Sequence, residues 1–184
     1  MRKIAVIGTA SGTGKTTVGR ALADRLGVPF VELDALHHGP DWTEATPDEL
    51  RARVEPIVDT DAWVIDGAYR GKLGDLVLER ADVIVWLDLP LRVWLPRLVR
   101  RTARRTITRE ELWNGNREEL RYVLHPTNSV VLYALRHHRA TRRRYSVELA
   151  RFPVVRVRST AEVDRFLNDA SGRASAARRS TPQP

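Results

Sequence analysis

The chain has 184 residues, of which 42% are hydrophobic, and a net charge of +8, values that suit one globular domain with a real core. It contains no cysteine, which excludes structural disulfides and cysteine-ligated zinc. No apolar run reaches the ~18 residues of a membrane span. The first residues, MRKIAVIG, become glycine-rich too soon for a signal peptide. We therefore expect a cytoplasmic protein without a membrane partner.

Apolar, β-branched runs alternate with helical patterns along the chain, beginning with the strand KIAVIG. The predicted strands are residues 3–8, 29–33, 62–66, 82–89 and 153–157. The predicted helices are residues 15–26, 48–59, 72–80, 91–105, 116–124, 130–149 and 161–167. Continuously apolar strands separated by helices indicate an α/β fold, with a five-stranded parallel sheet flanked by helices on both faces. In such sheets ligands bind at the carboxyl ends of the strands.

The first strand runs into GTASGTGKTT, residues 8–17, which has the pattern of a phosphate-binding loop, or P-loop. Counted back from Lys15, the usual spacing places Thr9 where the first glycine belongs, so we expect Gly8 to provide the turn one residue early. Loop N–H groups would hold the phosphates of ATP, Lys15 would reach the β- and γ-phosphates, and Thr16 would bind Mg²⁺. The predicted nucleotide-binding residues are Ser11, Gly12, Thr13, Gly14, Lys15, Thr16 and Thr17.

Two aspartates follow predicted strands at the ligand-binding edge of the sheet. Asp66 is the candidate to hold Mg²⁺ together with Thr16, and Asp34 faces the acceptor side, where it would orient a hydroxyl or assist the metal. For both, an aspartate that merely caps a turn is the structural alternative. Trp42 lies in the turn-rich part of the predicted acceptor-binding region, about residues 36–60, and is a candidate substrate contact.

The positive charge is concentrated between Arg97 and Arg144, where thirteen arginines accompany four glutamates. Because arginine forks suit phosphate groups, this segment predicts a polyphosphate ligand or nucleic acid, with a solvated helical face as the alternative. Residues 106–116 are polar and are expected to form a mobile loop. Residues 171–184, SGRASAARRSTPQP, have no apolar period and predict a disordered tail.

Further segments resemble adenylate kinase and related nucleoside monophosphate kinases. AWVIDGAYR, residues 62–70, is similar to their strand-end Asp-Gly-x-x-Arg segment, and WLPRLVRRT, residues 94–102, to the helix that leads into their lid. The resemblance implies a P-loop NTPase fold and a kinase domain over residues 1–170, with a short helical lid at about 102–116. It implies that Arg70 holds an acceptor phosphate or carboxylate. The lid-region arginines that it implies for catalysis are Arg97, Arg101, Arg117 and Arg121.

Two segments, FVELDALHHGPDW and ELWNGNRE, resemble the small adenylate-kinase-like proteins called topology-modulation proteins. FVELD also resembles the second strand of shikimate- and gluconate-type kinases, whose aspartate serves the substrate and the metal. The main hypothesis is therefore an enzyme that transfers the γ-phosphoryl group of ATP to a nucleoside monophosphate. The alternatives are a kinase of another small hydroxyl metabolite, of the shikimate or gluconate type, and a less favoured nucleic-acid-associated regulatory NTPase. The sequence specifies neither the acceptor nor the oligomeric state.

Overall fold

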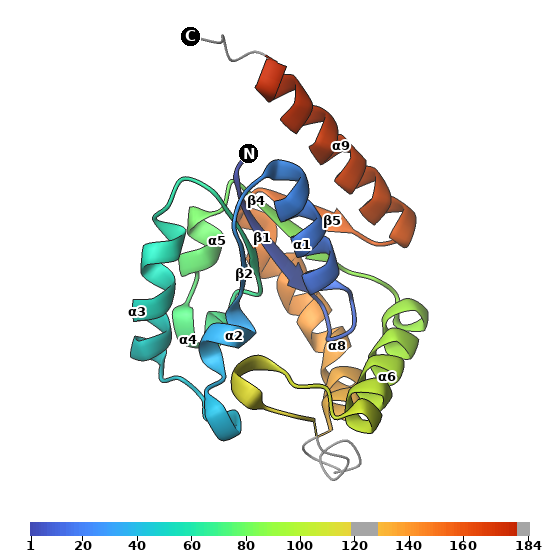
Figure 1. The fold of residues 1–184 in the computed structure, drawn as a ribbon. Helices are drawn as coiled ribbons and strands as arrows, with labels where there is room; N and C mark the ends of the chain where they lie inside the picture. The colour runs from blue at the N-terminus through green and yellow to red at the C-terminus, as the bar shows by residue number, and fades with distance from the viewer. Residues whose placement is uncertain (119–128, 180–184) are drawn as a thin grey trace.

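The computed structural model of the chain describes residues 1–118 and 129–179, with side chains up to residue 170. Its centre is a five-stranded, wholly parallel sheet in the order β2-β3-β1-β4-β5 (Figure 1). The strands are β1 (Lys3–Gly8), β2 (Phe30–Glu32), β3 (Trp63–Asp66), β4 (Val83–Leu87) and β5 (Val154–Val157). All five fall within the predicted apolar runs, and the predicted fold class is confirmed.

The helices lie on both sides of this sheet (Figure 1). The longer ones are α1 (Lys15–Leu26), α3 (Pro47–Val58), α6 (Leu91–Thr108), α8 (Val130–Glu148) and α9 (Thr160–Arg179). The short ones are α2 (Leu33–His37), η1 (Pro40–Trp42), α4 (Arg70–Leu73), α5 (Leu76–Arg80), η2 (Trp113–Gly115) and η3 (Leu149–Arg151). In the described part of the chain, no helix combines the length and the apolar character that crossing a bilayer requires.

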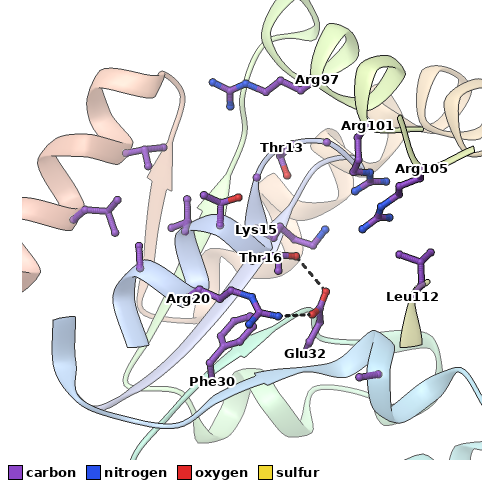
Figure 2. Close-up of a pocket in the computed structure, with 18 of the residues that line it drawn as sticks. Thr13, Lys15, Thr16, Arg20, Phe30, Glu32, Arg97, Arg101, Arg105 and Leu112 are labelled. Carbon is purple, nitrogen blue, oxygen red and sulfur yellow. Dashed lines mark hydrogen bonds and ion pairs between the residues drawn. The ribbon is translucent and has the colours of Figure 1, made fainter. Parts of the chain in front are cut away.

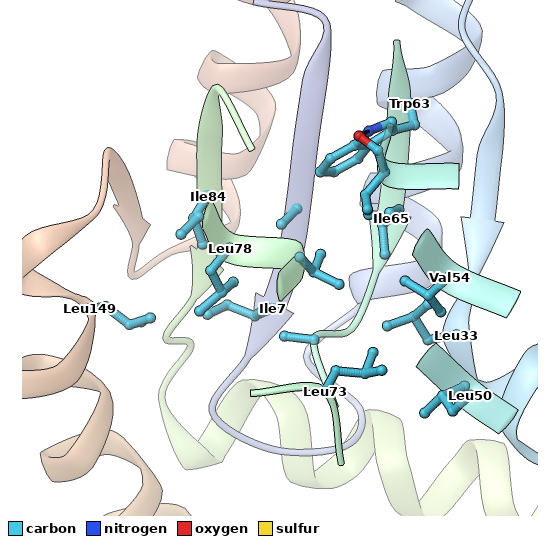
Figure 3. Packing of buried hydrophobic residues seen from close by; sticks show 14 of the residues in the cluster. Ile7, Leu33, Leu50, Val54, Trp63, Ile65, Leu73, Leu78, Ile84 and Leu149 are labelled. Atoms are coloured by element: carbon cyan, nitrogen blue, oxygen red, sulfur yellow. Dashed lines mark hydrogen bonds between the residues drawn. The ribbon is translucent and has the colours of Figure 1, made fainter. Parts of the chain in front are cut away.

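Alternate side chains of the central strand supply two separate cores, one on each face of the sheet. On one face, Ile4 and Val6 of β1 pack with Leu22 of α1 and Leu167 of α9. On the other face, Ile7 lies in a cluster built largely from α3, α5, β3 and β4, with Leu149 of η3 at its side (Figure 3). With both faces covered, the carboxyl edge of the sheet is the place left for a ligand.

Helix boundaries differ from the predicted ones at four places. The helix predicted over 72–80 is two short helices, because Gly74 adopts a φ of 61° between them. Helix α2 follows β2 directly, where only a turn-rich segment was expected. Helix α6 continues to Thr108, and residues 116–118 are not helical, while most of the helix predicted over 116–124 falls outside the described residues.

The fourth difference is at the end of the chain, where α9 continues to Arg179. The expected tail over 171–184 therefore begins inside a helical backbone, and residues 180–184 lie outside the described part. The tail stays a prediction, as does the division into a domain of residues 1–170.

Candidate active site

The P-loop joins β1 to α1 at the carboxyl edge of the sheet. Gly12 and Gly14 adopt φ angles of 83° and 90°, in the left-handed region that favours glycine. A Cβ atom on Gly12 would lie 2.8 Å from the Cβ of Leu98, so α6 packs directly on the loop. Helix α1 begins at Lys15 without a side-chain cap, which leaves its first N–H groups available to an anion.

Gly8 serves the loop by leaving space, not by turning. It is the last residue of β1, and a Cβ atom there would lie 2.3 Å from Oγ1 of Thr13 and 3.1 Å from Cγ of Lys15. The hydroxyl of Thr13 donates to the carbonyl of Ala10 at 3.1 Å and occupies this space. The expected turn at Gly8 is therefore wrong, because the left-handed residues of the loop are Gly12 and Gly14.

A cavity of about 1030 Å³ opens beside the loop. The loop and α1 form one wall, from Gly12 to Ala21, and α6 forms another (Figure 2). The start of α9 lines the cavity at one end, and residues 111–113 line it at the other. Every predicted nucleotide-binding residue from Gly12 to Thr17 is part of the lining, whereas Ser11 is not. The cavity is thus wide enough to hold a nucleotide together with a second small molecule.

Thr16 lies between the carboxylates of Asp66 and Glu32, and of these two Glu32 lines the cavity. The hydroxyl of Thr16 donates to Oδ2 of Asp66 at 2.6 Å and lies 3.4 Å from Oε1 of Glu32. Asp66 is buried, and this burial raises the pKa of its carboxyl group against the opposing effects of Lys15 and of the Thr16 hydrogen bond. The two carboxylates are neighbours because Glu32 of β2 pairs in register with Asp66 of β3.

These oxygen donors fit Mg²⁺. The ion is bound through one or two carboxylates together with waters and substrate phosphates, and does not require a cage made only of protein ligands. In keeping with this, the described residues contain no group of three or more histidine, cysteine, aspartate or glutamate side chains that could hold a metal alone. The structure thus brings together Thr16 and Asp66 as predicted and adds Glu32.

Replacing Asp66 by asparagine should raise the Mg²⁺ concentration needed for half-maximal turnover by ~10–100-fold, as for other residues that support a bound metal. Asparagine can still accept the Thr16 hydrogen bond. It also removes the Asp66 carboxyl group, whose raised pKa shows that burial disfavours its charged form. We therefore expect the thermal stability to be unchanged or higher. The measurement is a Mg²⁺ titration of turnover beside thermal unfolding. An unchanged Mg²⁺ dependence would mean that Asp66 only ends its strand.

Asp34 lies in the first turn of α2 and accepts a hydrogen bond of 2.6 Å from the hydroxyl of Tyr69. Tyr69 adopts a φ of 43°, a left-handed conformation that is uncommon outside glycine and asparagine. The ring of His37 lies 4.6 Å from the tyrosine ring. Burial, together with Asp34, raises the pKa of Tyr69, so the phenol remains a hydrogen-bond donor. This arrangement holds the Asp34 carboxylate in one orientation.

Three arginines of α6 share one face of the helix, at a spacing of four residues, and line the cavity. Arg101 and Arg105 point from α6 toward Lys15, and Arg97 reaches Oγ1 of Thr160 at 3.4 Å (Figure 2). Burial and the neighbouring Arg105 lower the pKa of Arg101. Its Nε is buried and has no hydrogen-bond partner among the described residues. Neighbouring guanidinium groups that are incompletely paired favour the binding of a polyphosphate.

Two short turns, residues 38–44 and 111–117, lie against each other where residues 111–113 line the cavity, and we call them the clasp. Asn116 is buried between them. Its side-chain oxygen accepts from the backbone N–H of Trp42 at 2.8 Å, and its amide donates to the carbonyl of Gly39 at 2.8 Å and that of Trp113 at 2.9 Å. The side chain of Asn116 thus pairs with backbone groups of the other turn, the N–H of Trp42 and the carbonyl of Gly39.

Further contacts join the two turns. The indole N–H of Trp42 donates to the carbonyl of Arg117 at 3.3 Å, and the amide of Asn114 donates to the carbonyl of His38. The ring of His38 stacks on Trp113, with 5.9 Å between the ring centroids. Of the segment 106–116 that was expected to be a mobile loop, residues 106–108 are the end of α6, and residues 113–116 pack against the turn at 38–44.

Known proteins that resemble this chain match it over the P-loop and the segment up to Asp34 and beyond. A family model for shikimate kinase matches residues 11–40. The shikimate kinase of Sulfurihydrogenibium sp. is 30% identical over 112 residues, which span 53% of this chain and 67% of that enzyme. The chain belongs to the shikimate kinase family. The shikimate kinase of Thermobifida fusca is 59% identical over 80 residues, 42% of this chain and 38% of that enzyme.

Solved structures extend the likeness in fold to nearly the whole chain. A shikimate kinase from Acinetobacter baumannii in complex with shikimate matches with a TM-score of 0.55 and 20% identity, over 96% of this chain and 94% of that one. A gluconokinase from Sinorhizobium meliloti matches with a TM-score of 0.54 and 23% identity, over 96% and 93%. These structures support the fold, and the family match supports the predicted small-metabolite kinase, whereas the adenylate-kinase and topology-modulation resemblance gains no specific support.

As a member of the shikimate kinase family, the protein is an ATP-dependent kinase that acts on a small molecule and uses Mg²⁺. The main hypothesis of a nucleoside monophosphate acceptor is therefore less well supported than its alternative. The cytoplasmic location stays a prediction.

The structure does not bring every predicted residue of this shikimate-kinase-like site to the cavity. Arg70 pairs instead with Asp75 at 2.6 Å and with Glu148. The side chain of Arg117 is 54% exposed, lies 3.7 Å from Glu111 and does not line the cavity. Both arginines are engaged by carboxylates of the protein itself, Arg70 by two of them and Arg117 by one.

The remaining candidates divide in the same way. Trp42 belongs to the clasp, and Trp42, Asp34 and Asp66 are not part of the cavity lining. Arg121 falls within 119–128, outside the described residues. Sequence reasoning missed Arg105, which lines the cavity while paired with Glu118 at 3.1 Å. Its spacing of four residues from Arg101 was the signal that could have found it.

Proposed function

We propose that this kinase transfers the γ-phosphoryl group of ATP to a hydroxyl group of a small metabolite, in the class to which shikimate and gluconate belong. The observation that supports this most is the order of side chains along the carboxyl edge of the sheet. The pair of Thr16 and Asp66 lies beside the P-loop, and the pair of Asp34 and Tyr69 lies at the start of α2. The first suits a metal-bound donor, and the second suits an acceptor hydroxyl.

In this mechanism Lys15 and the N–H groups of the P-loop hold the phosphates of ATP. Thr16 and Asp66, with Glu32 beside them, would hold Mg²⁺, which would supply positive charge against the phosphates. Arg101 stabilises the negative charge that spreads over the transferring group. Asp34 orients the acceptor hydroxyl and accepts its proton as the new O–P bond forms and the bond to ADP breaks.

The charges on the acceptor side favour a hydroxyl compound over a nucleoside monophosphate. Recognition of an acceptor phosphate requires an available arginine or lysine, but the described candidates are engaged elsewhere. Arg53 donates to the carbonyl of Leu36, Lys72 pairs with Glu44 at 2.9 Å, and Arg70 is paired as described above.

The concentration of arginines does not by itself support a nucleic-acid role. Part of this charge is engaged within the fold, since Arg101 and Arg105 line the cavity and the half-exposed Arg142 pairs with the buried Asp88 at 2.9 Å. A kinase cavity therefore accounts for arginines that would otherwise be counted toward a nucleic-acid surface.

A phosphotransfer screen tests the proposal directly. The purified chain is incubated with labelled ATP and Mg²⁺ and either shikimate, gluconate, related hydroxy acids and sugars, or the nucleoside monophosphates. We expect labelled product with a hydroxyl metabolite. Product with nucleoside monophosphates alone would restore the adenylate-kinase hypothesis. ATP turnover that rises only with added DNA or RNA would support the nucleic-acid alternative.

Replacing Tyr69 by phenylalanine should lower kcat/KM for the acceptor by about tenfold, since a hydrogen bond to a charged group contributes ~1.5–3 kcal/mol. The KM for ATP should stay the same, because Tyr69 contacts Asp34 and not the P-loop. Steady-state kinetics with each substrate varied makes the measurement. Tyr133→Phe is the matched control, because this tyrosine is 61% exposed. Equal kinetics in both variants would remove Asp34 from the acceptor side.

A further inference from the structure

Thr9, which stands where the usual P-loop has its first glycine, has a buried side chain that is fully hydrogen-bonded. Only 5% of the residue is exposed. Its hydroxyl donates to Oδ1 of Asp88 at 2.9 Å and accepts from the indole N–H of Trp86 at 2.9 Å. Its backbone N–H donates to the carbonyl of Leu87 at 3.2 Å. The first residue of the loop is thus tied to the end of β4 by main chain and side chain together.

The exchange of glycine and threonine at the start of the loop has a geometric reason. Consecutive residues leaving a strand point to opposite sides. Position 8 faces the interior of the loop, where Thr13 and Lys15 leave no room for a Cβ atom. Position 9 faces β4, where Trp86 and Asp88 require a hydroxyl. Glycine at 8 and threonine at 9 are therefore two parts of one arrangement.

Asp88 is itself held rigidly. Its side chain is 1% exposed, and Arg156 donates to its Oδ2 from two nitrogens, at 2.9 Å and 2.6 Å. Arg142 of α8 lies 2.9 Å from the same oxygen. The guanidinium of Arg156 also stacks 4.1 Å from the ring centre of Trp86. A buried carboxylate with two arginine partners from β5 and α8 is a fixed acceptor for the Thr9 hydroxyl.

We propose that Thr9 is a positioning residue for ATP binding. Anchored through Asp88 to β5 and α8, it holds the entry of the P-loop in the conformation that directs the later N–H groups at the phosphates. Gly12 and Gly14 are conformationally permissive, so the loop depends on outside contacts, of which the packing of α6 is one and the Thr9 anchor is another. The inference rests on the P-loop as the phosphate site and is independent of the acceptor.

The test is a series of three variants, with the Kd for Mg-ATP measured by calorimetry well below the unfolding temperature. Thr9→Ser keeps the hydroxyl and should bind within about twofold of wild type. Thr9→Val keeps the shape, and Thr9→Gly restores the usual motif residue. Both should nevertheless bind about tenfold more weakly, the range for loss of a hydrogen bond to a charged group. A weaker loop after restoration of the motif glycine is the distinguishing result.

Val58→Ala is the control for stability, because this buried residue ends α3 at the opposite edge of the sheet. It should lower the unfolding temperature without changing the Kd. Wild-type affinity in folded Thr9→Val and Thr9→Gly would overturn the proposal and leave Thr9 as a stabilising residue alone. Weak binding in Thr9→Ser as well would also overturn it, because the hydroxyl would then not be the group that matters. Wild-type protein that binds no Mg-ATP would instead remove the phosphate site itself.

Discussion

Replacing Lys15 by alanine should lower ATP-dependent phosphoryl transfer by about 1000-fold, at the upper end of what one electrostatic contact to a transition state contributes. Lys15 opens α1 and lines the cavity, with its side chain aimed between the P-loop and the arginines of α6 (Figure 2). The fold thus places the Lys15 ammonium group in the cavity, where a phosphate can reach it. Shortening the side chain removes that charge from the site while the helix is kept, since alanine is a good helix former.

The control is Lys3→Ala, which removes a lysine at the other end of β1. Lys3 donates to the carbonyl of Val58 at 3.2 Å, far along the sheet from the cavity. Its loss should leave turnover unchanged. Circular dichroism and thermal unfolding establish that both variants are folded before rates are compared. A folded Lys15→Ala protein with wild-type turnover would refute the assignment of the phosphate site.

Arg101→Ala should lower kcat by ~100-fold or more, as when an enzyme loses one preorganised group that meets developing charge. The expected effect on stability has the opposite sign. Burial and Arg105 lower the pKa of Arg101, so its positive charge is held at a cost in the folded protein. Removing it should leave the unfolding temperature equal or higher while the rate falls. This combination separates a group kept for chemistry from one kept for folding.

Arg100→Ala is the matched control, because Arg100 precedes Arg101 on the same helix and is exposed. Single-turnover kinetics with saturating ATP measures the chemical step without product release. If the two variants lose activity equally, the effect belongs to the helix and not to the cavity. If Arg101→Ala both unfolds and inactivates the protein, Arg101→Lys distinguishes the cases by keeping the charge without the planar fork.

The strands and the P-loop could be predicted because their signals are local. A buried parallel strand is read as an apolar run. The P-loop is read from the consecutive residues 12–17, which together form the phosphate-binding motif. Asp66 and Asp34 were proposed for a related reason, since residues that follow parallel strands share one edge of the sheet, and their roles stay predictions. Glu32 was missed although it ends β2, because only the register that pairs it with Asp66 shows that the two carboxylates meet.

What could not be predicted depends on contacts between distant segments. Arg70 and Arg117 have the right residue type, but the carboxylates that engage them come from other parts of the fold. The proposed positioning role of Thr9 depends on Asp88 and Arg156, which lie 79 and 147 residues further along the chain. The folded turn at 111–117 was taken for a mobile loop because its partner is the turn at 38–44 and not its own neighbours.

The clasp has a consequence for how sequences of this kind can change. Asn116 satisfies a donor and an acceptor of the other turn, on Trp42 and Gly39, so its replacement leaves polar backbone groups unpaired on a segment far away in the chain. Neither turn can then be altered alone without loss. We expect HHGPDW and WNGNR to be inherited as a unit, with substitutions in one matched by substitutions in the other. A chimaera that takes one of the two turns from a relative should be less stable than a chimaera that takes both turns from that relative.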